Sequence, residues 1–288
     1  MNEINGSLQR ACLRIGRGNF WHPERRSFCW FDILNSKFYE QIDDQSTKVT
    51  ECLGIASAAA RIDCNLLLVA VDDGLHILNL GQKWESYLEI KSNNSLTRSN
   101  DCRVHPSGSF WFGTMGCKAE KGAGSSYNVN SGKQQLLYSN VTIPNSTCFT
   151  ADGSIGYFAD SALNLVWHVE LNPSTELPVS ERKVFLSFES NIIPDGAIVD
   201  SQGNFWIALW GASKVAAYHP DGSLFIEFHL PATQVSCPAF GGVNCSELRV
   251  TTAWANLDSI SRSSQPNAGR IFKFTSEHVG QIEAMYRL

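Results

Sequence analysis

The sequence repeats one local pattern six times, and this recurrence constrains the fold more than any other feature. Each repeat has a short apolar strand, a turn containing Gly, Pro, Asn or Asp, and a second strand with aromatic or β-branched residues. The centres of the second strands are Trp30, Leu68, Trp111, Tyr157, Trp206 and Val250. These centres are roughly 38 to 49 residues apart, and a period of about 40 to 50 residues with four strands per repeat is typical of a β-propeller. The sequence therefore predicts an all-β, six-bladed β-propeller, with residues 1–288 in a single domain.

The predicted strand pairs can be stated residue by residue. They are 19–24 with 27–32, 58–63 with 66–71, 104 with 110–112, 146–149 with 155–160, 197–200 with 205–208, and 238–242 with 248–253. We expect residues 282–288 to share a blade with residues 11–15 and so close the ring. No window keeps an apolar helical period over three turns, so long helices are not expected.

Composition and charge exclude several classes of function. The net charge is −5, and Lys and Arg do not cluster, which argues against a nucleic-acid partner. The N-terminus lacks the basic start and apolar run of a signal peptide, and no apolar run is long enough to span a membrane. The nine cysteines are scattered, with no C-x-x-C pair, and are interpreted as free thiols in a reducing compartment. We expect a cytoplasmic monomer or weak homo-oligomer without a membrane partner.

Polar residues stand just ahead of four of the predicted inner strands. They are Arg17 in the first repeat, Arg98, Asn100 and Asp101 in the third, Asn145 in the fourth and Asp195 in the fifth. Any one of them could cap a turn. Because the first strands of propeller blades converge on the central channel, we expect these side chains to meet at one mouth of that channel.

Common catalytic motifs do not compete with this cluster. The sequence has no G-x-S-x-G elbow, no H-E-x-x-H and no phosphate-binding P-loop. The seven histidines fall mostly in turns or on outer strands. Hydrolysis by this chain would therefore depend on a metal ion or a carboxylate.

Several segments, in this order along the chain, resemble the senescence-marker-protein, gluconolactonase and regucalcin family. They are Ile15-Gly16-Arg17-Gly18, Trp21-His22-Pro23, Trp30-Phe31-Asp32-Ile33, Arg98-Ser99-Asn100-Asp101, Gly113-Thr114-Met115-Gly116, Ile143-Pro144-Asn145-Ser146, Pro194-Asp195-Gly196, Trp210-Gly211 and Phe240-Gly241-Gly242. The resemblance implies a six-bladed propeller that hydrolyses sugar lactones with a divalent metal at the channel mouth. It also implies a small-molecule partner, a sugar lactone or a sugar acid.

The resemblance assigns roles to individual positions. Asn145 and Asp195 match two metal ligands of the family, but Arg17 stands where the family has a ligand Glu in an L-G-E-G element. Arg98 and Asn100 match sugar-binding positions, and Glu120 is the nearest carboxylate to a further substrate-binding position. The resemblance thus implies a divalent metal (Ca²⁺, Mg²⁺, Mn²⁺ or Zn²⁺). We expect its binding to be weakened or absent because of Arg17, since an arginine stays positively charged.

Three hypotheses follow from Arg17. In the first, the chain is a lactonase in which a weakened metal or the guanidinium itself polarises the lactone carbonyl, while Asp195 orients or deprotonates the attacking water. In the second, it is a pseudoenzyme that binds a sugar acid or lactone without turnover. In the third, Arg17 turns outward and another acidic side chain completes a metal site.

Overall fold

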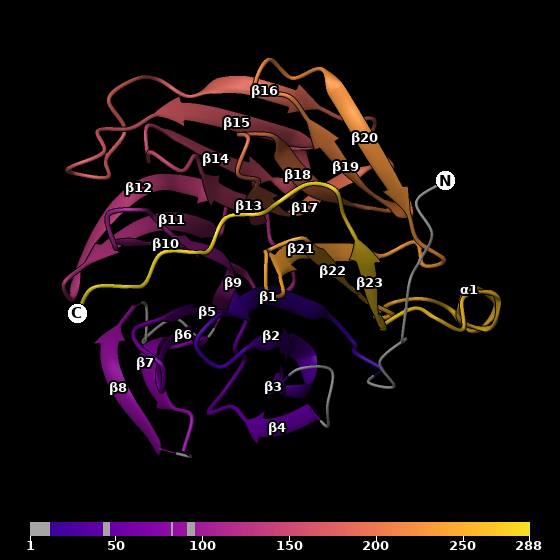
Figure 1. Cartoon of the computed structure of the whole chain (residues 1–288), viewed down its shortest axis with the longest axis horizontal. Coiled ribbons are helices and arrows are strands. Elements are labelled where there is room, and N and C mark those ends of the chain that lie inside the picture. Colours follow the sequence, from indigo (N-terminus) through magenta and orange to yellow (C-terminus); the bar gives the residue numbers. More distant parts are fainter. Residues whose placement is uncertain (1–11, 43–46, 82, 91–95) are drawn as a thin grey trace.

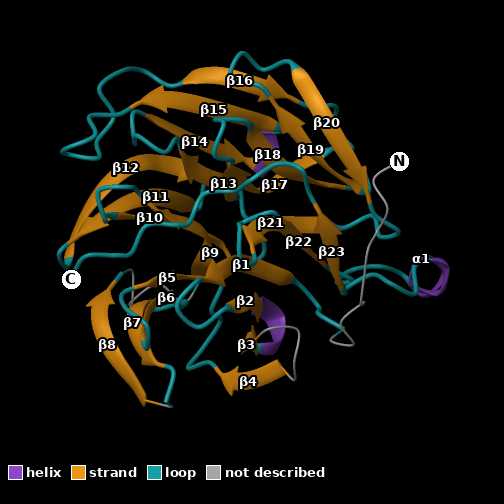
Figure 2. Cartoon of the chain, in the orientation of Figure 1, coloured by secondary structure: helices purple, strands orange, loops and turns teal. Residues whose placement is uncertain are grey.

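The computed structural model describes residues 12–42, 47–81, 83–90 and 96–288. Six antiparallel sheets surround a central axis, and the strands of each sheet follow one another in chain order from the axis outward (Figure 1). Figure 2 shows strands in all six sheets and only short helical segments. These segments are η1 (Ile33–Asn35), η2 (Ser161–Leu163) and α1 (Ser259–Ser264). The predicted all-β, six-bladed propeller is confirmed, whereas its interpretation as one domain stays a prediction.

The strands fall into four concentric positions. The innermost are β1 (Gly16–His22), β5 (Ala58–Arg61), β9 (Thr97–Val104), β13 (Pro144–Phe149), β17 (Ile193–Val199) and β21 (Val235–Gly241). The second are β2 (Ser27–Asp32), β6 (Leu66–Ala70), β10 (Phe110–Gly116), β14 (Ile155–Asp160), β18 (Phe205–Trp210) and β22 (Glu247–Thr252). The third are β3 (Lys37–Ile42), β7 (Gly74–Asn79), β11 (Gly124–Asn130), β15 (Leu165–Glu170), β19 (Lys214–Tyr218) and β23 (Ile271–Thr275). The outermost are β4 (Thr47–Glu51), β8 (Lys83–Glu89), β12 (Lys133–Val141), β16 (Lys183–Ser187) and β20 (Leu224–His229).

The inner strand pairs lie where the sequence predicts them, but every innermost strand except β5 begins earlier than predicted; β9, for example, begins at Thr97 and not at Val104. Their burial explains why the sequence specifies them. Every residue of β2 and of β10 is buried, because each sheet is covered on both faces by its neighbours. Strands in that position need apolar residues on both faces, and aromatic and aliphatic side chains supply them. The outermost strands are mostly exposed, as in β4 and β12.

The core consists of separate apolar clusters, each lying mainly between two neighbouring blades. Between the fifth and sixth blades, Trp206 packs edge-on against Phe240 with ring centroids 5.1 Å apart. Between the sixth and first, Phe28 and Trp30 pack with Ala239 and Ile271. The ring is thus closed by packing between faces of sheets.

The predicted closing strand at 282–288 is wrong. Residues 276–288, called the C-terminal strap below, contain no strand and run from β23 across the face of the ring (Figure 1). Their backbone bonds include Ser201 to Val279 at 2.9 Å, Tyr286 to Arg61 at 2.7 Å and Arg287 to Gly108 at 3.0 Å. The strap is therefore held by the second, third and fifth blades instead of joining one sheet.

The other closing segment is partly outside the described residues, since residue 11 is not described. Within the described part, Ile15 forms an isolated bridge with Ala253 in the sixth blade. All nine cysteines are free, and five of them are buried. Across the parts of the chain that the structure describes, no helix is both long and apolar enough to cross a membrane.

Candidate active site

Four inner strands bring the predicted polar residues to one end of the channel. These residues belong to the strands themselves, whereas the sequence analysis placed them ahead of the strands. In each of these strands the pairing register shifts at the polar residue: after Arg17 in β1, around Asn100 in β9, after Asn145 in β13 and around Asp195 in β17. A β-bulge bends a strand and changes the direction of a side chain. The repeated bulge thus allows the four polar side chains to converge.

The bulges are marked by unusual backbone geometry at two equivalent positions. Gly18 follows Arg17 with φ 57°, and Ser146 follows Asn145 with φ 57°. A Cβ on Gly18 would lie 2.5 Å from the carbonyl oxygen of Ser57. Glycine is favoured by this φ and is required beside Arg17 by the lack of space.

Arg17 is the centre of the cluster. Its side chain is almost fully buried, its Nη1 donates to Oδ1 of Asn145 at 2.6 Å, and its Nη2 forms an ion pair with Oδ1 of Asp195. Burial lowers the pKa of Arg17, and the carboxylate of Asp101 partly opposes this shift. Arg17 points inward, which is contrary to the hypothesis in which it turns outward.

Asn145 is held in place by three side-chain contacts. Its Oδ1 also accepts a bond from Nδ2 of Asn100 at 3.0 Å, and its Nδ2 donates to Oγ of Ser161 at 2.6 Å. The Ser161 hydroxyl donates in turn to the carbonyl oxygen of Pro194 at 2.6 Å. This network links the first, third, fourth and fifth blades, and Ser161 is a member that sequence reasoning missed.

Arg98 lies at the edge of the cluster and contacts Asn100, which is buried. Nη1 of Arg98 donates to Oδ1 of Asn100 at 3.1 Å and to the carbonyl oxygen of Ser99 at 2.9 Å. Arg98 is partly exposed, and burial, together with the positive charge of Arg17, lowers its pKa to about 10. Arg98 thus presents a partly exposed guanidinium beside the buried one.

Asp101 lies in the same strand but has a different environment. Its Oδ2 accepts the backbone N–H of Thr147 at 2.7 Å. Burial raises the pKa of Asp101, while the positive charges of Arg17 and Arg103 lower it. The charge of Asp101 therefore interacts both with Arg17 in the cluster and with Arg103, a partly buried arginine further along β9.

Glu120 lies apart from these contacts. It is exposed in the turn that follows β10, and its Oε2 accepts the N–H of Lys118 at 3.1 Å. Among the described residues, this hydrogen bond of the Glu120 carboxylate is to its own turn and not to the cluster. Its substrate-binding role stays a prediction.

The residues at this site do not fit a divalent metal. The oxygen atoms of Asn145 and Asp195 that would face such an ion both contact the Arg17 guanidinium. Unit charges about 4 Å apart interact by about 4 kcal/mol at an effective dielectric of 20, and a divalent ion doubles this repulsion. Within the described residues, no group of three or more His, Cys, Asp or Glu side chains is arranged to hold a metal. One anionic carboxylate and one neutral amide oxygen are too few ligands for a hard cation beside a guanidinium.

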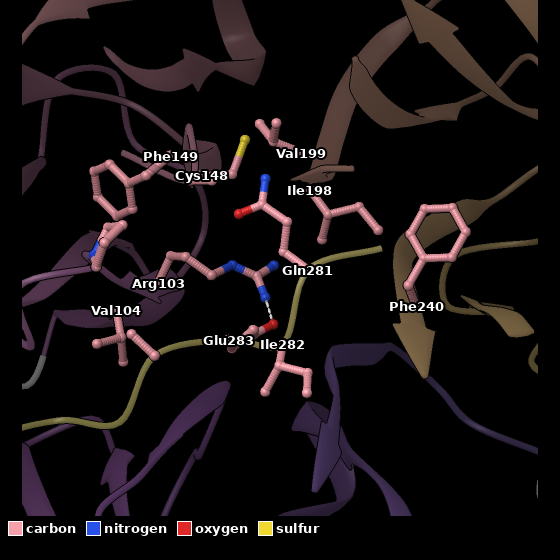
Figure 3. Close-up of a pocket in the computed structure, with 13 residues that line it drawn as sticks. Arg103, Val104, Cys148, Phe149, Ile198, Val199, Phe240, Gln281, Ile282 and Glu283 are labelled. Carbon is pink, nitrogen blue, oxygen red and sulfur yellow. Dashed lines mark hydrogen bonds and ion pairs between the residues drawn. The ribbon is translucent and has the colours of Figure 1, made fainter. Parts of the chain in front are cut away.

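The opposite end of the channel has a pocket of about 160 Å³ beneath the C-terminal strap. Figure 3 shows Arg103 pointing toward Glu283 of the strap, with Phe149, Ile198 and Phe240 around them. Arg103 and Glu283 form an ion pair, and Nη2 of Arg103 also donates to the carbonyl oxygen of Ala197 at 3.0 Å. Sequence reasoning missed this pair because the strap was interpreted as a strand.

Comparison with known proteins identifies the family of the chain. Residues 15–254 match the family model described as SMP-30/Gluconolactonase/LRE-like region. A protein of Rhizobium meliloti (strain 1021) whose name includes "sugar lactone lactonase" is 38% identical over 285 residues, covering 98% of this chain and 97% of that protein. An L-arabinolactonase of Azospirillum brasilense is 29% identical, with coverage of 99% and 98%.

A solved structure gives the same result. The crystal structure of a calcium-binding protein, regucalcin, from Agrobacterium tumefaciens has a TM-score of 0.95 and 36% identity, covering 97% of this chain and 96% of that one. The chain therefore belongs to the SMP-30/gluconolactonase/LRE-like family.

Proposed function

We propose that this chain hydrolyses a sugar lactone at the cluster formed by Arg17, Asn100, Asn145 and Asp195. The observation that carries the proposal is the convergence of these side chains, from four blades, on one buried hydrogen-bonded network. Relatives that cover nearly the whole chain have sugar lactone lactonase or L-arabinolactonase in their names, and these names supply the substrate class.

The residues take distinct roles in this proposal. Arg98 donates hydrogen bonds to hydroxyl oxygens of the sugar. Asn100 positions Arg98 and Asn145, since its Nδ2 already donates to the Pro144 carbonyl oxygen at 2.8 Å and to Oδ1 of Asn145 at 3.0 Å. Asp195 uses Oδ1 in its ion pair with Arg17, so Oδ2 is the oxygen that accepts a proton from the attacking water. The water oxygen bonds to the carbonyl carbon, the bond from that carbon to the ring oxygen breaks, and the proton passes from Asp195 to the ring oxygen. The product is an open-chain sugar acid.

A pH-indicator assay over a panel of aldonolactones tests the proposal. We expect acid release above the uncatalysed rate for at least one lactone, and its loss in Asp195→Asn, which keeps the shape of the side chain. A matched control is Asp221→Asn on an exposed turn, where the carboxylate bonds only to Ser223 among the described residues. Equal rates for the wild-type chain and Asp195→Asn on every lactone would overturn the proposal.

The second candidate function is binding of a sugar lactone or sugar acid without turnover. The ion pair with Arg17 favours it, because the guanidinium engages Oδ1 of Asp195 and leaves that oxygen unavailable to an attacking water. Saturable binding of a sugar acid by calorimetry, with no acid release from any lactone, is the result that selects this function.

A further inference from the structure

We propose that the Arg17 guanidinium is the permanent cation of this site, so that the chain works without a divalent metal and holds the lactone carbonyl with arginine N–H groups. That Arg17 replaces a metal ion follows from the contacts of its guanidinium with Asn145 and Asp195. That Arg17 binds the lactone carbonyl rests on the proposed function.

The first support is the position of the guanidinium. It contacts the two oxygen atoms, Oδ1 of Asn145 and Oδ1 of Asp195, that would otherwise face a bound cation. Asp195 belongs to β17 and Asn145 to β13, so the guanidinium bridges two blades from a third, as a bound ion would. The acceptors are thus already bound to a cation supplied by the chain.

The second support is that Arg17 is held rigidly. Gly18 and the bulge in β1 direct the side chain inward. Asn145 is fixed by Ser161 and Asn100, and the backbone carbonyl of Asp195 accepts the hydroxyl of Ser146 at 2.5 Å. A cation held by a preorganised shell acts on developing negative charge without rearrangement during the reaction.

The third support is the number of donors. A guanidinium has five N–H groups in a planar fork, and the contacts to Asn145 and Asp195 are made through one N–H each of Nη1 and Nη2. Its remaining N–H groups can donate to the lactone carbonyl oxygen. As water adds to the carbonyl carbon, the carbonyl electron pair moves onto that oxygen, and the guanidinium stabilises the charge while keeping all its protons.

The experiment combines metal binding with turnover. Calorimetric titration with Ca²⁺ and with Mn²⁺ is carried out on the wild-type chain, Arg17→Glu and Arg17→Gln, and lactone hydrolysis is measured with and without EDTA. Arg182→Glu is the matched control, because Arg182 is exposed on the outer part of the fourth blade and stacks on Trp167. Thermal melting verifies that each variant is folded.

The expected results are specific. The wild-type chain and Arg182→Glu show no saturable metal binding, and EDTA leaves their hydrolysis unchanged. Arg17→Glu gains one saturable site, because the introduced carboxylate joins Asn145 and Asp195 as a third oxygen ligand. Arg17→Gln binds no metal and loses about 10²–10³-fold in kcat, the range found when one donor to an oxyanion is removed.

Other outcomes separate this inference from the proposed function. Saturable metal binding by the wild-type chain that disappears in Asp195→Asn overturns the inference, as does hydrolysis that EDTA abolishes. If the wild-type chain neither binds metal nor hydrolyses any lactone while Arg17→Glu gains a metal site, the proposed function fails and the role of Arg17 as the permanent cation stands. Should Arg17→Glu not fold, the wild-type titration still decides.

Discussion

The two ends of the channel each contain an arginine paired with a carboxylate, but the pairs are built differently. At the site end, Arg17 and Asp195 both belong to inner strands, and their side chains are 8% and 4% exposed. At the strap end, Arg103 belongs to β9, while Glu283 belongs to an irregular segment and is 21% exposed. The first pair is therefore fixed by the blades, and the second ties down a segment that is not a strand of any sheet.

This difference distinguishes the end of the channel that contains the candidate site from the end that the strap covers. The site-end pair has further polar residues from other blades around it, which is what binding a polar substrate requires. The strap-end pair has mainly apolar neighbours such as Phe149, Ile198 and Phe240, with Gln281 bonded to the carbonyl oxygen of Asp200 at 2.7 Å. Similar ion pairs thus form part of the candidate site at one end of the channel and hold the C-terminal strap in place at the other.

The largest expected contrast comes from removing the two carboxylates. Asp195→Ala leaves the Arg17 charge buried without its ion-pair partner, which costs about 3–5 kcal/mol in the free energy of unfolding. Glu283→Ala costs less, about 1–2 kcal/mol, because Glu283 is partly exposed and Arg103 keeps its hydrogen bond to the Ala197 carbonyl oxygen. Urea unfolding of both variants measures the difference. Equal losses would mean that the two ends are not built differently.

A smaller contrast concerns glycines with positive φ. Gly18→Ala at the site end combines backbone strain with a contact 2.5 Å from the Ser57 carbonyl oxygen, and we expect a loss of about 3 kcal/mol. Gly203→Ala, in the turn between β17 and β18, meets only Pro220 at 3.8 Å and should lose about 1 kcal/mol from strain alone. Denaturant midpoints compare the two. A loss at Gly18 no larger than that at Gly203 would argue against close packing beside Arg17.

The smallest expected effect is a pH dependence that belongs to the strap end. Burial lowers the pKa of His22, the last residue of β1, and the nearby charge of Arg61 lowers it further, while Glu24 opposes the shift. The folded state then binds fewer protons than the unfolded state. The contribution of a neutral His22 to stability is fully present above its ordinary pKa near 6.5 and is lost as the pH falls below that value.

His22→Phe tests this dependence while keeping a ring in the buried position. Urea midpoints at pH 7.5 and pH 5.5 should fall less in the variant than in the wild-type chain. Identical falls would show that the acid sensitivity arises elsewhere, whereas the site-end cluster of Arg17, Asn100, Asn145 and Asp195 contains no histidine.

The sequence predicts the scaffold better than the direction of its side chains. The inner strand pairs follow from apolar runs such as Phe110-Trp111-Phe112 and from their Gly turns, which are local signals. The position of Asn145 within β13, and not ahead of it, depends on a bulge that only pairing with β14 creates. Ser146 shows why this could not be foreseen, since a non-glycine residue adopts φ 57° there.

The strap was predicted wrongly for a similar reason. Alternating apolar residues in 282–288 are typical of a strand, but the pattern serves a different contact. The side chain of Tyr286 is buried in the apolar core under the strap, its hydroxyl lies 3.0 Å from that of Tyr87, and this hydroxyl accepts the N–H of Gly132 at 3.2 Å. Long-range contacts of this kind leave no local signal.

Anomalous X-ray diffraction from crystals of the wild-type chain soaked in Mn²⁺ tests the role of Arg17 most directly. The predicted result is electron density for the guanidinium between Asn145 and Asp195, with no anomalous peak there. A manganese peak at that position, with the side chain of Arg17 turned away, would contradict the account.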